Sequence, residues 1–176
     1  MGAQEYRYDT EVVRLMYDYA SSVVWFPDPV RYERSGLSLE LIADLRAWGR
    51  LHDEGLDYEQ QWRSPELPGR VDRERQELAH RLGDELGSAF EIEFDVPQGG
   101  GFGPRHASYR SPEPPTNPEA AAIFTALADH ARAERAELAR RAAERRVAGD
   151  GEVSGGWFAV LQNGQKFVPL ERPERE

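Results

Sequence analysis

The sequence contains no cysteine, no long apolar run and no complete catalytic motif, and each absence excludes a class of protein. Without cysteine there is no disulfide framework, thiolate zinc site, iron–sulfur cluster or cysteine nucleophile. No stretch approaches the roughly 18 apolar residues of a membrane span, and the first 20 residues lack the apolar segment of a signal peptide. We therefore expect a cytoplasmic protein of 176 residues, with one domain or one domain plus an arm.

Enzyme and metal motifs are incomplete in the sequence. Neither Gly-x-Ser-x-Gly nor His-Glu-x-x-His occurs, so nothing supports a serine hydrolase or a zincin. His52-Asp53 resembles the metal-binding pair of HD-type phosphohydrolases, but no histidine precedes it to complete such a site. Glu77 and His80 have the spacing of a bundle metal-ligand pair, but there is no second Glu-x-x-His. We expect no metal, no cofactor and no established catalytic residue.

Acidic side chains outnumber basic ones, 32 to 22, and the excess lies in one part of the chain. Residues 1–100 carry 21 acidic and 11 basic side chains, a net charge of −10, whereas residues 101–176 carry 11 of each. Such an anion is repelled by phosphate, which argues against nucleic acid as a partner. Arginines of the segment 132–146 alternate with glutamates, which predicts internal ion pairs rather than a phosphate-binding face. We expect no membrane partner either.

Apolar periodicity predicts the elements of the first 96 residues. Val13, Leu15 and Tyr17 alternate as in a strand, and Phe90, Ile92, Phe94 and Val96 do so again. Apolar residues at helical spacing follow Ser38, a residue that favours the start of a helix. The predicted elements are a strand at 11–17, a loop at 18–36, a helix at 38–55, a loop at 56–70, a helix at 71–86 and a strand at 90–96.

The rest of the chain has a different composition. Glycine and proline are frequent over 97–117, which predicts a linker or loop. Asn117-Pro118 marks the start of a long helix over 118–148, and Asn163-Gly164 predicts a β-hairpin over 152–170. The predicted fold is α/β or α+β, with a small sheet packed with two helices, plus a long helix and a C-terminal β-hairpin. Whether the hairpin joins the first sheet stays open.

Aromatic and acidic residues alternate unusually often near the start of the chain. Tyrosine and tryptophan are favoured at binding surfaces because they combine a large contact area with a polar group. The alternative is that these rings only close the core. We interpret Asp53, Glu54 and Asp57 as the solvated end of a helix. The residues predicted to bind a protein partner are Asp18, Tyr19, Trp25, Asp28 and Trp62.

Two other sites are compatible with the sequence. A pocket beside the first strand, using Asp18, Asp28, Tyr19 and His106, would indicate an enzyme or small-molecule-binding protein. The glycine-rich run before Pro104 opens no helix, so it is not a phosphate loop. Arg105, His106 and Arg110 behind it are the candidate anion-binding residues.

Residues 11–96 resemble a group of small uncharacterised actinobacterial proteins. The resemblance is carried by the sequence from Val13 to Ser22, by Trp25 and by Leu45-Arg46-Ala47-Trp48. Proteins of this group have a strand followed by an Asp-Tyr loop and a tryptophan. They often have proline where this chain has Tyr17. The resemblance implies a bacterial cytosolic origin and no catalytic residue.

Three functions follow from these observations. The leading one is a non-catalytic bacterial protein-binding module that neutralises a basic partner, as immunity proteins do, since concentrated negative charge steers association with a cation. The second is the enzyme or small-molecule binder described above. The third is a structural or assembly subunit, in which the long helix would pair with a copy of itself, although it lacks sustained heptads. The oligomeric state stays open.

Overall fold

A computed structural model describes residues 3–18, 20–96, 105–148, 159–160 and 166–167. The chain divides into two units, Met1–Ala133 and Glu134–Glu176. In chain order the elements are α1 (Ala3–Thr10), β1 (Val12–Leu15), β2 (Val24–Trp25), the 3-10 helix η1 (Tyr32–Arg34), α2 (Leu39–Gly55), α3 (Leu67–Leu86), β3 (Glu91–Val96), β4 (Arg105–Tyr109), α4 (Pro118–Ala148), β5 (Ala159–Val160) and β6 (Lys166–Phe167).

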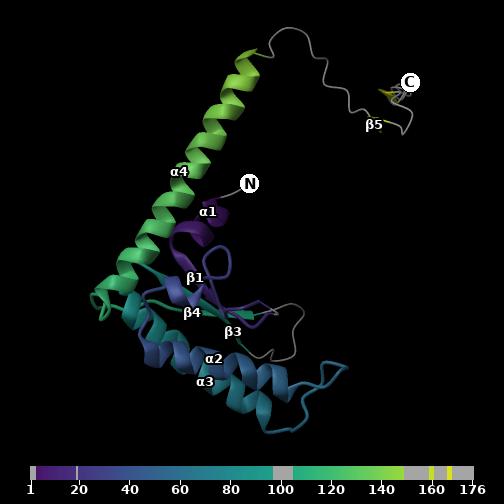
Figure 1. The fold of residues 1–176 in the computed structure, drawn as a ribbon, viewed down its shortest axis with the longest axis vertical. Coiled ribbons are helices and arrows are strands. Elements are labelled where there is room, and N and C mark those ends of the chain that lie inside the picture. Colours follow the sequence, from purple (N-terminus) through teal and green to yellow (C-terminus); the bar gives the residue numbers. More distant parts are fainter. Residues whose placement is uncertain (1–2, 19, 97–104, 149–158, 161–165, 168–176) are drawn as a thin grey trace, which may run out of the picture. The chain divides into compact units, whose positions relative to one another are not determined.

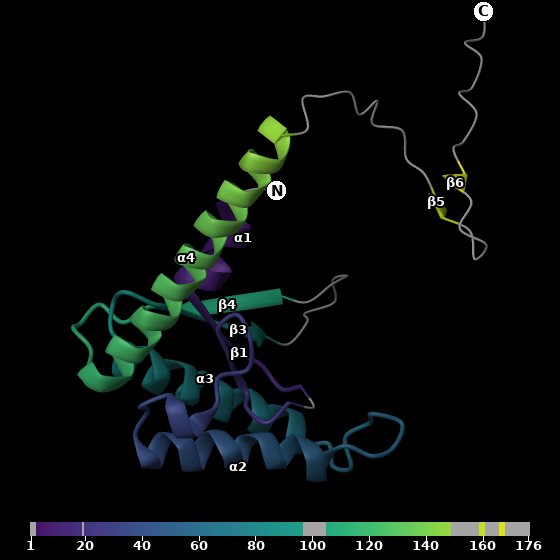
Figure 2. The same ribbon diagram turned by 45° about the horizontal axis from the view of Figure 1, so that its top comes forward.

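The first unit contains a mixed four-stranded sheet in the order β2-β1-β3-β4 (Figure 1). The central strands β1 and β3 are parallel, and β2 and β4 pair with them in the antiparallel direction. A parallel pair needs a long crossover connection, and the helices α2 and α3 lie within it. They lie together along one face of the sheet (Figure 2). This α+β arrangement confirms the predicted fold class.

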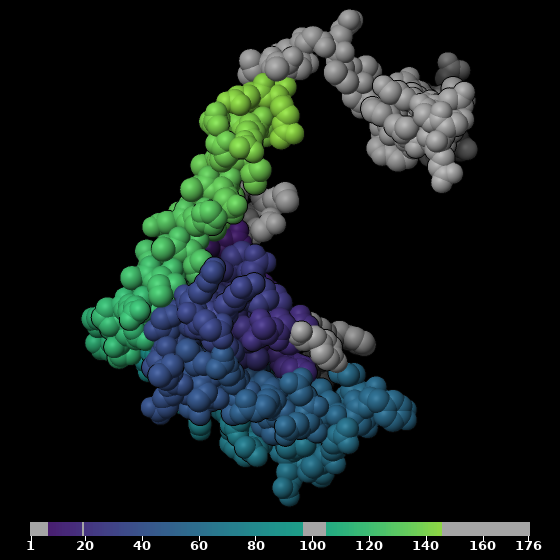
Figure 3. All heavy atoms as spheres, in the orientation of Figure 1, coloured from purple at the N-terminus to yellow at the C-terminus, as the bar shows by residue number. Residues whose placement is uncertain are grey.

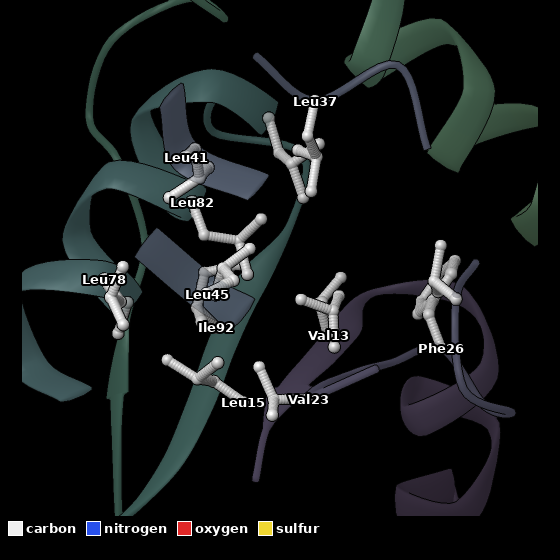
Figure 4. Packing of buried hydrophobic residues seen from close by; sticks show 14 of the residues in the cluster. Val13, Leu15, Val23, Phe26, Leu37, Leu41, Leu45, Leu78, Leu82 and Ile92 are labelled. Carbon is white, nitrogen blue, oxygen red and sulfur yellow. The ribbon is translucent and has the colours of Figure 1, made fainter. Parts of the chain in front are cut away.

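The core forms between that face of the sheet and the two helices. Val13, Leu15 and Ile92 of the sheet lie close to Leu45 and Leu82 of the helices (Figure 4), and all five side chains are fully buried. The alternation in β1 and β3 therefore has the predicted orientation. Each large apolar side chain buried in this way contributes about 1.5–3 kcal/mol relative to an exposed one.

The two core helices end as their sequences suggest, but one begins earlier than predicted. The hydroxyl oxygen of Ser38 accepts a hydrogen bond from the backbone N–H of Leu41, so Ser38 caps α2. Helix α3 begins at Leu67 rather than at 71, because Pro68 lies in its first turn, where its missing N–H costs nothing. Gly87 ends α3 with a φ of 75°, and a Cβ there would lie 2.6 Å from the backbone nitrogen of Pro115.

Four elements were not predicted. One is α1, and two more, β2 and the 3-10 helix η1, lie inside the loop predicted over 18–36. The fourth is β4, so the linker or loop expected over 97–117 is wrong for residues 105–109. Strand β4 forms because it pairs with β3 over five residue pairs while Ala107 and Tyr109 pack against the core. Residues 97–104 lie outside the described part of the chain.

Helix α4 begins at Pro118 as predicted, and its first turns belong to the first unit. Asn117 caps it by accepting a hydrogen bond from the N–H of Ala120, and donates to the backbone oxygen of Gly36 at 2.8 Å. Phe124 is fully buried, and the centre of its ring lies 5.8 Å from the centre of the Phe26 ring. Phe124 therefore joins the start of this helix to the core.

The second unit contains the C-terminal part of α4 and the strands β5 and β6. Arg140 pairs with Glu137 and Glu144, and Arg141 pairs with Glu137, which confirms the internal ion pairs expected for this helix. Strands β5 and β6 pair with each other in a two-stranded sheet of their own. Asn163-Gly164, the predicted turn, lies outside the described residues.

Candidate protein-binding surface

A cavity of about 300 Å³ lies where the chain leaves β1. One side is formed by residues that follow the strand, including Asp18 and Ser21, and the other by Arg46, Arg50 and Asp53 of α2. We call it the β1 cavity. Strand β1 ends at Leu15, two residues before Tyr17, and α2 places Arg46, Arg50 and Asp53 at successive turns.

Charges of both signs line the β1 cavity. Arg46 pairs with Glu33 at 2.8 Å, and its guanidinium lies 5.1 Å from the centre of the Tyr32 ring. The hydroxyl of Tyr17 donates a hydrogen bond to Asp53. Two arginines and two aspartates therefore surround the cavity, and it favours no simple anion or cation.

Four aromatic rings meet beneath the rim of the β1 cavity. The buried ring of His52 stacks on Tyr17 with centroids 4.4 Å apart and planes at 9°. Trp48 and Trp62 approach it at 4.5 and 5.6 Å. We call Tyr17, Trp48, His52 and Trp62 the His52 cage. The pKa of His52 is lowered, mainly by burial and to a smaller extent by the charge of Arg75, while the hydrogen bond to the Trp48 backbone oxygen and the charge of Asp53 act in the opposite direction.

The last turn of α2 and the loop that follows it carry a dense group of acidic side chains. Asp53, Glu54, Asp57 and Glu59 lie within seven residues, and the side chain of Tyr58 among them is 90% exposed. The carboxylate of Asp57 accepts hydrogen bonds from the backbone N–H groups of Glu59 and Gln61, which fixes the turn. We call residues 53–61 the acidic loop. The part of it that follows α2 extends past the ends of α2 and α3 in the ribbon (Figure 1) and projects from the surface (Figure 3).

The structure separates the residues that the sequence predicted as one partner-binding group. Asp18 is exposed beside the β1 cavity, but Asp28 is not among the residues that line it. Trp62 packs within the His52 cage. Trp25 is half-buried on the edge strand β2, and its indole N–H has no hydrogen-bond partner among the described residues. Tyr19 lies outside the described residues.

The predicted anion-binding residues do not converge. His106 pairs with Asp95 at 2.9 Å, and Arg110 pairs with Glu91 at 3.3 Å, so carboxylates already contact both. Because side chains alternate along β4, Arg105 lies on the opposite face from His106.

The predicted enzyme residues are also spread over two sites. His106 lines a separate cavity of about 140 Å³ with Tyr8, Arg14 and Glu93, and Asp18 is not among its lining residues. Within the described residues, no three histidine, aspartate or glutamate side chains are placed to hold a metal ion.

The exposed ring of Tyr58 is the feature of the acidic loop that the sequence analysis does not predict. Asp53 and Glu54 lie exposed in the last turn of α2, as expected for the solvated end of a helix, and Asp57 follows that turn. A tyrosine inside a run of carboxylates is a detectable signal, since a large ring is costly to expose without a partner. Its exposure becomes evident only once the loop is known to stand away from the helices.

Comparison with known proteins finds one similarity, and it covers slightly less than half of the chain. Residues 11–96 match the family described as Serratia CdiI immunity protein-like. This match supports an immunity-type protein-binding module with a protein as its partner. No curated protein and no solved structure matches the chain. Among the described helices, none is long and apolar enough to cross a membrane.

Proposed function

We propose that the chain is a non-catalytic bacterial immunity-type protein that binds and neutralises a basic protein partner. The observation that carries this proposal is the family match over residues 11–96. That range runs from the start of β1 to the end of β3, so it includes the β1 cavity, the His52 cage and the acidic loop.

The binding surface in this proposal is the acidic loop together with the adjoining rim of the β1 cavity. Tyr58 provides an exposed ring of the kind that dominates binding energy when a partner covers it. Glu54 and Glu59 are exposed, and neither forms an ion pair within the described residues. Their charges are therefore available to a partner. Asp53 and Asp18 add two carboxylates at the cavity, which Arg46 and Arg50 also line.

Co-expression tests the function directly. Each basic protein that a neighbouring gene encodes would be produced in a test bacterium with and without the chain. We expect growth to stop with the neighbour alone and to recover when the chain is present. Binding of the two purified proteins would be measured by calorimetry. Recovery of growth without a stoichiometric complex would contradict neutralisation by binding.

A pair of matched variants tests the surface. Glu54→Gln with Glu59→Gln removes two charges from the acidic loop, whereas Glu77→Gln with Glu113→Gln removes two exposed charges elsewhere. Both variants have the same net charge. We expect the first to weaken the complex at least tenfold and the second to change it less than threefold, because charge acts most strongly at short range. Equal losses would place the partner on another surface.

The enzyme and small-molecule interpretation keeps one supporting observation, the polar β1 cavity. It predicts that a metabolite, and no protein, co-purifies with the chain. The assembly interpretation predicts a concentration-dependent dimer in sedimentation. Neither outcome is expected if the partner is the basic neighbour.

A further inference from the structure

His52 connects three parts of the first unit. It belongs to α2, it stacks on Tyr17 at the end of β1, and its ring lies 5.6 Å from that of Trp62 in the connection to α3. Trp62 also bridges to Leu56, so it closes the base of the acidic loop. The position of the loop therefore depends on how the His52 ring packs.

The hydrogen bonding of His52 fixes its neutral form. Its Nδ1 lies 3.1 Å from the backbone oxygen of Trp48, so this nitrogen donates and the lone pair is on Nε2. Among the described residues no group hydrogen-bonds to Nε2. Protonation would therefore put a charge on a buried ring without adding a hydrogen bond in the present arrangement.

The charged groups around the cage do not compensate this charge fully. Arg75 of α3 repels a proton on His52, and burial opposes it more strongly. Arg75 is itself paired with Asp72 on the same helix. From its own helix Asp53 attracts the proton, but its carboxylate already accepts the hydroxyl of Tyr17 at the end of β1.

We propose that His52 is a pH-sensitive contact that holds the base of the acidic loop against the end of β1 when neutral and releases it when protonated. The stacked ring turns toward water to solvate its charge, and Trp62 and Tyr17 lose their common packing partner. A second consequence rests on the proposed function: the partner dissociates more readily in mildly acidic solution.

An NMR titration of the whole chain from about pH 8 to pH 5 tests the proposal without any partner. We follow the His52 ring, the indole N–H of Trp62 and the backbone amides of Tyr58 and Glu59. We expect all of them to shift with one shared midpoint below the usual histidine value of about 6.5. The other three histidines provide independent midpoints in the same sample.

Two variants provide controls. His52→Phe keeps an aromatic ring and removes the proton, so the loop signals should become insensitive to pH. His80→Gln, on α3 beside Tyr109, should leave the transition unchanged. If His52→Phe does not fold, the wild-type titration still tests the proposal, because the midpoint of the loop signals can be compared with the midpoint of each histidine. Loop signals that follow another histidine, or a His52 midpoint at or above 6.5, would overturn the proposal. Because no partner is needed, that result would leave the proposed function standing.

Discussion

At the scale of single residues, Gly83 and Gly49 differ in what a methyl group would contact. A Cβ on Gly83 of α3 would lie 2.6 Å and 2.8 Å from ring carbons of Tyr109 and 3.3 Å from Ile92. A Cβ on Gly49 of α2 would meet only Val23, at 3.4 Å, which is ordinary contact. Both glycines are inside helices, where alanine is intrinsically favoured by about 0.5–1 kcal/mol.

These contacts predict opposite effects for the same substitution. Gly83→Ala should lower the free energy of unfolding by about 1–3 kcal/mol, because the methyl group pushes the Tyr109 ring out of a packed site. Gly49→Ala should leave it unchanged or raise it by up to about 1 kcal/mol. Urea denaturation of the two variants beside the wild type measures both. Stabilisation by Gly83→Ala would show that the ring has free space to move.

The buried histidine predicts a pH dependence of stability. The folded state holds the pKa of His52 below its ordinary value, mainly through burial, so the unfolded chain binds this proton first. The contribution of neutral His52 to the free energy of unfolding is therefore complete above about pH 6.5. It decreases as the pH falls from there toward the pKa that His52 has in the folded protein. Urea denaturation at pH 7.5 and 5.5 measures the change. The difference in the free energy of unfolding between the two pH values should be smaller in His52→Phe than in the wild type. An equal difference in the two proteins would mean that other groups cause it.

At the scale of elements, the accuracy of prediction from sequence depended on whether local signals determined the element. Some elements have a local signal in the sequence and form where that signal predicts them. Ser38 caps α2, Asn117 caps α4, and the apolar alternation through Ile92 marks β3. Strand β4 has no strong pattern of its own, since its residues are Arg-His-Ala-Ser-Tyr. It is a strand because it pairs with the edge of β3, where Phe94 lies opposite Ala107. This pairing depends on the tertiary fold and cannot be predicted from the sequence of β4 alone.

The candidate site shows the same limit. Asp18 could be placed at the end of a strand from sequence alone, but its proximity to Asp53 depends on how α2 packs on the sheet. Trp25 and Trp62 stay predicted partner-binding residues, and their half-buried positions follow from neighbours that are distant in sequence. Composition identified the acidic and aromatic character of the region, and tertiary packing decided which of those side chains remain exposed.

Helix α4 allows its two halves to be compared on one element. Phe124 is fully buried, whereas Leu138 in the second unit is 59% exposed. Phe124→Ala should lower the free energy of unfolding of the first unit by about 3–5 kcal/mol, because it leaves a cavity beside Phe26 and Phe90. Leu138→Ala should change it by less than about 0.5 kcal/mol. Similar losses from both would mean that the exposed half also contributes to the core.

At the scale of the whole molecule, the net charge belongs to one unit. The first unit carries 24 acidic and 14 basic side chains, a net charge of −10, and the second carries eight of each. Several acidic groups of the first unit already hold internal partners, such as Asp44 with Arg81 and Glu91 with Arg7. The acidic loop carries four acidic side chains and no basic one, so a basic partner would meet uncompensated negative charge there.

This distribution predicts how the complex responds to salt. Attraction between the first unit and a basic partner accelerates their encounter at low ionic strength, and salt screens it, with a screening length of about 10 Å at 0.1 M and 3 Å at 1 M. Raising the salt concentration from about 50 mM to 500 mM should therefore reduce the association rate at least tenfold. The dissociation rate should change much less, because it depends on short-range contacts such as those of Tyr58. Stopped-flow or surface-binding kinetics with the partner that co-expression identifies measures both rates. A salt-insensitive association rate would mean that the negative charge of the first unit serves solubility rather than recognition.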